Sequence, residues 1–326
     1  MAEASVPRRR VADRDDAADG AAPVAAIVVT WRPDPAALAQ VLGRLRPQVD
    51  ALFVVDNSEG AAERGAVREL ARRNGAAAIE VGYNSGIAHA QNLGISRALA
   101  EGAGSILLCD DDSLPDTDLV ARLRTGMAAA RAAGVRVAAV GPLVRDFRDA
   151  AATLAFVDTP LGPRRAPPTA GGSTVDAAFL LASGCLIDAQ ALRQVGSMRE
   201  DLFIDHVDLE WGLRARRAGW SLLVLTDVPL LHRLGERTLR LWPLRRRVVH
   251  LHAPVRNYYL VRNTVLLLRG PLFSRGWRLG YLLWLVRFIA FNTVFVAPRR
   301  ARAAAMLRGL RDGLRGRGGP APDSLT

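Results

Sequence analysis

Short apolar runs alternate with segments of helical length over the first half of the chain, and this alternation limits the possible folds more than any other feature. The apolar runs lie at 25–30, 52–57, 78–81, 105–109 and 137–140. The helical segments lie between them, at 35–46, 61–74, 86–100 and 119–133. Strands and helices that alternate in this way form a mostly parallel sheet with helices on both faces. We therefore predict an α/β fold with a doubly wound sheet.

Polar residues stand where these predicted strands end. Thr30, Asp56 and Asp110 close three of the apolar runs, and Asn84 follows a fourth. In open α/β sheets, ligands bind in the crevice beyond the carboxyl ends of the strands. Four such residues in succession predict a single crevice.

Three consecutive aspartates, Asp110, Asp111 and Asp112, follow the run at 105–109. In an extended chain, Asp110 and Asp112 point to the same side. Two carboxylates at this spacing suit Mg²⁺ or Mn²⁺, which binds one or two carboxylates together with diphosphate oxygens. For the triplet alone, a solvated acidic turn is the simpler interpretation, and only the downstream residues favour the metal site.

A second cluster of polar residues precedes a helix predicted at 207–218. Asp205 and Asp208 both suit the start of a helix, and we assign only that capping role to Asp205. A general base must lie beside the hydroxyl group that it deprotonates, and we choose Asp208 for this role. Glu210 cannot share a helix face with Asp208. Beyond the strand predicted at 221–225, His232 could complete a metal shell, although a lone histidine is more often structural.

Length and composition indicate a globular protein. The chain has 326 residues, half of them apolar, which is enough for one large or two small domains. Its two cysteines, Cys109 and Cys185, lie in apolar runs, as expected for buried thiols of a cytosolic protein. Residues 1–22 are polar and lack the apolar core of a signal peptide, so we expect a disordered leader.

Positive charge is concentrated in the last third of the chain. Residues 233–326 hold 19 arginines and three acidic residues, a net charge of +16, whereas the whole chain carries +12. The segment 279–297 is apolar except for Arg287 and Asn292, and a central arginine costs about 2.5–3.5 kcal/mol on insertion scales. We predict peripheral attachment to an anionic membrane surface, with a buried core helix as the alternative. The flanking residues are Arg275, Arg278, Arg299, Arg300 and Arg302, with Trp277 and Trp284; Arg256 and Arg262 are candidates to meet a lipid phosphate.

Seven short motifs follow one another at 55–58, 83–95, 108–113, 183–184, 202–216, 232–235 and 256–263. In this order they resemble the motifs of family 2 glycosyltransferases of the GT-A fold, and within them the bacterial rhamnosyltransferase group. The resemblance covers about residues 24–263. Val207 stands where many relatives have Glu before the base, and Asp111 stands where a Gln is common.

The resemblance implies a role for each matching residue. Asp208 would be the catalytic base. The nucleotide-sugar donor would bind at Thr30, Asp56, Asn84, Asp110, Asp111 and Trp211, with the side chain of Asp111 turned away from the metal. The metal would bind at Asp112, Asp110 and His232. The turn at Ser183 and Gly184 would shape the sugar side of the site.

The resemblance further implies an inverting, metal-dependent transfer, with L-rhamnose from dTDP-rhamnose as the first choice and a cell-envelope or lipid-linked glycan as acceptor. A UDP-sugar donor, such as that of galactofuranose, is the alternative. A nucleic-acid-binding protein or a non-catalytic membrane scaffold is the alternative of another class, but the tail arginines alternate with apolar runs and form no nucleic-acid-binding motif.

We expect a catalytic domain at 23–240, a basic helical region on the acceptor and membrane side at 241–318, and a tail at 319–326. We expect the protein in the cytoplasm, at the inner face of the membrane.

Overall fold

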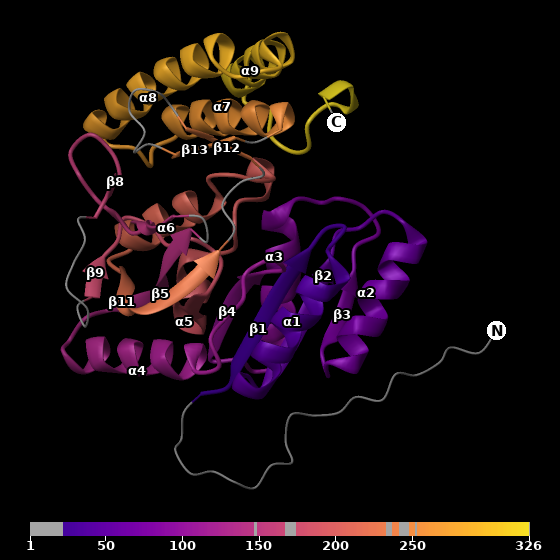
Figure 1. The fold of residues 1–326 in the computed structure, drawn as a ribbon. Helices are drawn as coiled ribbons and strands as arrows, with labels where there is room; N and C mark the ends of the chain where they lie inside the picture. Colours follow the sequence, from indigo (N-terminus) through magenta and orange to yellow (C-terminus); the bar gives the residue numbers. More distant parts are fainter. Residues whose placement is uncertain are drawn as a thin grey trace, which may run out of the picture.

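The computed structural model describes residues 22–146, 149–166, 174–232, 237–240, 248–251 and 253–325. A nine-stranded sheet lies at its centre, in the order β3-β2-β1-β4-β10-β5-β11-β9, with β6 paired to β5 (Figure 1). Within this described part, β3, β2, β1, β4, β5 and β11 all run in one direction. The remaining three strands, β10, β9 and β6, run against them. The prediction of an α/β fold with a mostly parallel sheet is confirmed.

The strands of the central sheet are β1 (Val24–Thr30), β2 (Ala51–Asp56), β3 (Ala77–Glu80), β4 (Ser105–Asp110), β5 (Val137–Asp146), β6 (Asp149–Thr153), β9 (Thr174–Asp176), β10 (Cys185–Asp188) and β11 (Ser221–His232). Two small hairpins pair β7 (Phe156–Val157) with β8 (Arg164–Arg165), and β12 (Arg237–Arg240) with β13 (Val248–Leu251). The helices are α1 (Pro35–Leu45), α2 (Ala61–Arg73), α3 (Ile87–Ala100), α4 (Leu119–Ala132), α5 (Ala189–Val195), α6 (Val207–Arg217), α7 (Pro254–Arg269), α8 (Arg275–Val294) and α9 (Arg299–Leu314). Short 3-10 turns lie at Arg46–Gln48, Glu200–Leu202 and Asp323–Leu325.

Helices cover both faces of the sheet because successive strand residues point to opposite sides. In β1, Ile27 and Val29 pack with residues of α3, α5 and α6. Ala26 and Val28, from the same strand, pack on the other face with residues of α1, α2 and α4. Every residue of β1 is buried, as expected for a central strand covered on both faces.

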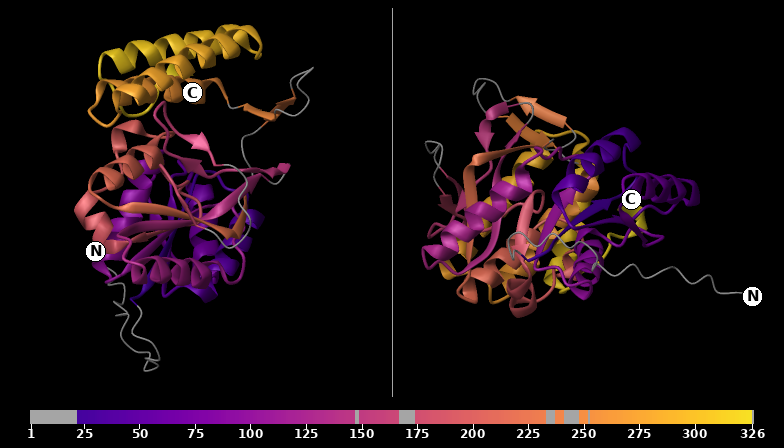
Figure 2. Two further views of the ribbon diagram at one scale, coloured as in Figure 1. Left: turned by 90° about the vertical axis from the view of Figure 1, so that its left-hand side faces the viewer. Right: turned by 90° about the horizontal axis from the view of Figure 1, so that it is seen from below.

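The three C-terminal helices form a further layer over one end of the sheet (Figures 1 and 2). Val261 and Val265 of α7 pack against Leu285 of α8 and Met306 of α9. A second apolar cluster joins α6 to this layer, through Leu209 and Leu213 of α6 and side chains of α7 and α8. The C-terminal helices therefore lie directly against the helix that carries Asp208.

Two segments differ from the expectation. The segment 149–174 was expected to be an irregular loop, but its described residues form β6, the β7–β8 hairpin and the start of β9. The loop within that hairpin packs on α8, where the indole N–H of Trp277 donates to Asp158 Oδ1 and the Thr159 carbonyl, both at 2.9 Å. The strand expected at 179–187 begins only at Cys185 because Gly184 adopts a left-handed turn (φ 77°).

No helix in the described ranges is long and apolar enough to cross a lipid bilayer.

Candidate active site

The ends of β1, β2 and β4 lie level with one another. Thr30 pairs in register with Asp56, and Val29 pairs with Asp110. The polar residues that follow these neighbouring strands therefore meet at one edge of the sheet, as predicted. This edge is the crevice position at which α/β sheets bind ligands.

One carboxylate oxygen of Asp56 is buried and has no hydrogen-bond partner among the described residues. Its side chain is fully buried, and Oδ1 accepts a hydrogen bond from the Ser58 backbone N–H at 2.9 Å. Within the described part of the chain, Oδ2 is buried and has no hydrogen-bond partner. A buried carboxylate oxygen without a partner is costly, so it marks a place where a bound donor group would be favourable.

Asn84 belongs to a small hydrogen-bond network that joins β2 to the start of α3. Its side-chain oxygen accepts from the Gly86 N–H at 3.1 Å. The Ser85 hydroxyl donates to Asn57 Oδ1 at 2.8 Å, and the Asn57 amide donates to the Gly86 carbonyl at 3.3 Å. Asn57 and Ser85 were not predicted to have a role, although the polar residue directly after Asp56 was a signal available in the sequence.

The middle aspartate of the triplet is held by Thr30. The Thr30 hydroxyl donates to Asp111 Oδ2 at 2.6 Å. Burial raises the pKa of Asp111 to about 6, and the negative charges of Asp112 and Asp110 add to this effect. Asp111 is thus turned towards β1, whereas Asp112 is exposed to solvent. A contact between Asp111 and the donor remains a prediction.

The chemistry of Asp110 and Asp112 suits a hard cation. Among the residues that the structure describes, no three His, Cys, Asp or Glu side chains gather into a complete metal cage. Mg²⁺ does not require such a cage, because it binds through one or two carboxylates and takes its other ligands from water and substrate phosphates. His232 is the last residue of β11 and pairs with Asp146 of β5, but its side chain lies outside what the structure describes.

Asp208 lies in the first turn of α6. It is close enough to Asp110, the first aspartate of the triplet, for that negative charge to affect its pKa. Its Oδ1 accepts from the Leu209 N–H at 2.8 Å. Burial raises the pKa of Asp208 to about 6, and the negative charges of Asp205 and Asp110 raise it further. A carboxylate with a pKa near neutrality is well suited to accept a proton. Glu210, in contrast, is bound to Arg214 at 2.9 Å on a different side of the helix.

The expectation that Asp205 caps α6 is wrong. The residue before the helix is His206, which makes no side-chain capping bond. The Asp205 carboxylate instead pairs with Arg256 of α7 at 3.0 Å. Arg256 is therefore bound to the loop that precedes α6.

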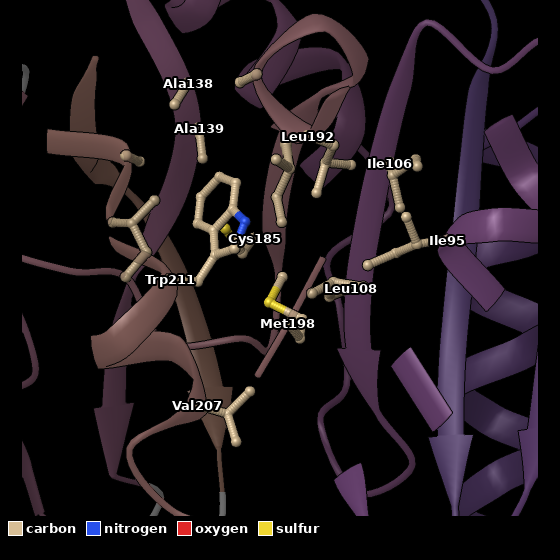
Figure 3. Packing of buried hydrophobic residues seen from close by; sticks show 14 of the residues in the cluster. Ile95, Ile106, Leu108, Ala138, Ala139, Cys185, Leu192, Met198, Val207 and Trp211 are labelled. Carbon is tan, nitrogen blue, oxygen red and sulfur yellow. The ribbon is translucent and has the colours of Figure 1, made fainter. Parts of the chain in front are cut away.

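Trp211 lies elsewhere than expected. Only 4% of the residue is exposed, and its indole N–H donates to the Gly196 carbonyl at 2.9 Å. Figure 3 shows the ring packed among core side chains that include Cys185 and Met198. Val207 and Trp211 are four residues apart on α6, so they share the face that is turned to the sheet. This position places the indole in the core and gives no support to a contact with the donor sugar.

Both cysteines are buried free thiols, as expected. Burial raises the pKa of Cys109 and of Cys185 well above the usual range of a thiol. Both therefore stay protonated at neutral pH and act as packing residues.

A family model described as glycosyltransferase like family 2 matches residues 21–247. The chain belongs to glycosyltransferase family 2. A dTDP-rhamnosyl transferase of Shigella flexneri, RfbF, is 30% identical over 246 residues, which are 75% of this chain and 79% of that protein. The protein is therefore a glycosyltransferase, as the motifs predicted.

Solved structures show the same fold. S. aureus TarS matches with a TM-score of 0.55 and 13% identity over 93% of this chain, which spans about half (50%) of that chain. The mannosyltransferase PcManGT from Pyrobaculum calidifontis, in complex with GDP-Man and Mn²⁺, matches with a TM-score of 0.53 and 14% identity, over 90% of this chain and 87% of that one. These structural matches confirm the GT-A fold.

Proposed function

We propose that this family 2 enzyme transfers L-rhamnose from dTDP-rhamnose to a cell-envelope or lipid-linked glycan, with inversion at the anomeric carbon. The observation that carries the proposal is that Asp208 lies near enough to Asp110, at the carboxyl edge of the sheet, for the charge of Asp110 to raise its pKa. Similarity to the Shigella flexneri dTDP-rhamnosyl transferase supports the choice of donor.

The crevice offers a place for each part of the donor. Asp56 Oδ2, buried and unpaired within the described chain, can accept from the N3–H of a thymine or uracil ring. Thr30 pairs in register with Asp56, and Asn84 belongs to the hydrogen-bond network that includes the next residue, Asn57. Asp112 and Asp110, with His232 as a further ligand, would hold Mg²⁺ or Mn²⁺, whose charge offsets that of the departing nucleoside diphosphate.

The chain's own residues then supply the base and the geometry. Asp208 accepts the proton of the acceptor hydroxyl as the oxygen bonds to the anomeric carbon. The bond from that carbon to the diphosphate oxygen breaks on the opposite side, so the configuration inverts. Most of the rate gain would come from the placement of the reacting groups and from charge stabilisation.

A panel of donors tests the proposal. We expect dTDP-rhamnose to bind, and to be hydrolysed slowly, in preference to UDP-galactofuranose, UDP-glucose and UDP-N-acetylglucosamine. Binding should require Mg²⁺ or Mn²⁺ and disappear with a chelator. Preference for a UDP-sugar would overturn the rhamnosyl assignment but keep the reaction type. Absence of binding to any of the four donors would contradict the donor assignment altogether.

We also propose that the enzyme attaches to an anionic membrane surface through α8. Leu282 (51% exposed) and Val286 (61% exposed) belong to a face of α8 that carries other exposed apolar residues. Exposed arginines, including Arg275, Arg278 and Arg287, border this face. An apolar stripe bordered by arginines suits the headgroup region of an anionic bilayer.

Two of the residues expected at this surface lie elsewhere. Arg302 is buried, where it donates to Asn257 Oδ1 and to the Ala297 carbonyl. Trp277 is buried beneath the β7–β8 hairpin. The proposed contact surface is therefore narrower than the sequence indicated and is centred on the outer face of α8.

Replacing Leu282 and Val286 together by Glu should abolish binding to vesicles that contain phosphatidylglycerol, because it places two charges in the apolar stripe. Co-flotation with such vesicles measures this, with pure phosphatidylcholine vesicles for comparison. The matched control is the pair Ala128→Glu and Ala129→Glu on α4, at the opposite end of the molecule in Figure 1, which should still float. Equal flotation of both variants would contradict the proposal. Dimerisation of the unmodified protein through α8, seen by light scattering, would assign the face to a second copy instead.

A further inference from the structure

The loop that leads to Asp208 is held in an unfavourable backbone conformation. We call residues 203–206 the base loop. Phe203, Asp205 and His206 all have positive φ angles, of 66°, 63° and 63°. Residues other than glycine rarely adopt this conformation, and it persists only where surrounding structure imposes it. Asp208 follows two residues after the loop, so the loop sets where the carboxylate points.

Asn263 of α7 binds the backbone of this loop. The residue is fully buried, and its side-chain amide lies 2.9 Å from the Leu202 carbonyl, 2.7 Å from that of Ile204 and 3.0 Å from that of Asp205. A single side-chain amide therefore contacts three backbone carbonyl oxygens of an irregular segment of the chain. These contacts fix the path of the chain rather than the packing of a side chain.

Arg262, the neighbouring residue, binds the start of the same segment. It is fully buried, so it cannot meet a lipid phosphate as the sequence suggested. Its guanidinium donates to the Asp201 carbonyl at 3.1 Å, to the Leu202 carbonyl at 2.8 Å and to the Gly319 carbonyl. Burial of a guanidinium is costly unless its N–H groups are hydrogen-bonded, and here the backbone carbonyls of this segment accept those bonds.

Further residues of α7 hold the side chains of the loop. Arg256 pairs with Asp205, and His206 Nε2 lies 2.9 Å from the Thr264 hydroxyl. The Phe203 ring stacks on Tyr259, with ring centroids 5.0 Å apart and an interplanar angle of 5°. Side chains at three of the four loop positions are therefore bound by α7.

The other side of the base loop touches the segment that carries Asn84. The Phe203 carbonyl accepts from the Ile87 N–H at 2.8 Å, at the first residue of α3. This approach requires Gly86, because a Cβ there would lie 2.6 Å from the Phe203 oxygen. The loop thus bridges the proposed nucleotide side of the crevice and the base.

We propose that Asn263 and Arg262 are positioning residues, which hold the base loop so that Asp208 faces the crevice. The inference rests on the proposed function of Asp208. It gives the arginine and asparagine at 262–263 a role in the reaction although neither reaches the substrate. It also explains why polar residues occupy the most buried positions of α7.

Asn263→Ala tests this proposal against Asn257→Ala. Asn257 is a matched control, because it is a buried asparagine on the same helix that binds Arg302 and Met306 of α9 instead of the loop. We expect Asn263→Ala to increase amide hydrogen exchange in the peptide 201–210, whereas Asn257→Ala increases exchange in α9. Hydrolysis of dTDP-rhamnose, or of whichever donor in the panel the wild-type protein hydrolyses, should fall on the order of 10²-fold in Asn263→Ala, because small displacements of reacting groups have effects of this size. Donor affinity should change less than about twofold, since this substitution removes no group from the proposed donor pocket.

The two readouts fail independently. Unchanged exchange in 201–210 would overturn the positioning role whatever the substrate is. Increased exchange with unchanged hydrolysis would leave the loop a structural element and also overturn it. If no donor is hydrolysed by the wild-type protein, the proposed function has failed, while the exchange result still decides whether Asn263 orders the loop. Should Asn263→Ala not fold, Arg256→Gln removes a partly exposed contact to the same loop and is expected to show the same two effects, at a smaller size.

Discussion

Asp208→Asn is expected to lower turnover by roughly 10²–10⁴-fold, the loss that follows removal of a general base. The amide keeps the size of the carboxylate but cannot accept the proton of the acceptor hydroxyl. Donor affinity should stay close to that of the wild-type enzyme, because Asp208 is not among the groups proposed to hold the nucleotide or the metal. Steady-state turnover and calorimetric titration with dTDP-rhamnose measure the two quantities.

The pH dependence of turnover is a second test of the proposed role of Asp208. Because burial raises the pKa of Asp208 to about 6, the wild-type enzyme should lose activity as the pH falls through 6, where the base becomes protonated. Turnover should be level between pH 7 and 8. The residual activity of Asp208→Asn should lack this acidic limb.

Stability provides the control for Asp208→Asn. The folded protein binds the Asp208 proton more tightly than the unfolded chain does, so the contribution of this residue to stability falls as the pH rises from 4 to 6. Above pH 6 this ionised, half-buried carboxylate destabilises the fold by up to about 3 kcal/mol. Asp208→Asn should therefore melt at a higher temperature than the wild type at pH 8, in the presence of chelator. A lower melting temperature would attribute the loss of activity to damage of the fold.

The positions of the strands and of the crevice could be predicted because they depend on local pattern. Apolar runs followed by polar residues predicted β1, β2 and β4 and placed Thr30, Asp56 and Asp110 at one edge. The neighbouring ends of parallel strands meet regardless of the loops between them. The segment 149–174 was not predicted correctly because its prolines and glycines suggest irregular chain. In the structure β6 pairs with the preceding strand β5, β7 pairs with β8, and β9 pairs with β11, which is distant in sequence.

The environment of the base could not be predicted in the same way. Left-handed backbone is most common for glycine and is enriched for asparagine, aspartate and histidine, so Asp205 and His206 gave only a weak signal and Phe203 gave none. Arg262 looked like a surface residue because buried arginine is rare, and only tertiary contacts explain its position. Trp211 is different, since its spacing from Val207 already placed both residues on one helix face.

Asp112→Ala should abolish the metal-dependent part of donor binding, because it removes the more exposed of the two carboxylates proposed to hold Mg²⁺ or Mn²⁺. In calorimetry, added Mn²⁺ should strengthen dTDP-rhamnose binding to the wild type and have no effect on the variant. The binding that remains in Asp112→Ala should equal that of the wild type in chelator, since Asp56 and Asn84 would still hold the nucleoside. Turnover should fall below detection.

Asp111→Asn is the matched control, because it neutralises the adjacent carboxylate while an amide oxygen can still accept from the Thr30 hydroxyl. It should retain the effect of Mn²⁺ on donor binding. If both variants lose that effect equally, the triplet attracts the cation only through its summed charge, and Asp112 has no individual role as a ligand. A response to Mn²⁺ that survives in Asp112→Ala would place the ion on other groups. The difference between these two neighbouring aspartates therefore tests whether strand geometry, which turns Asp111 towards Thr30, also selects the metal ligand.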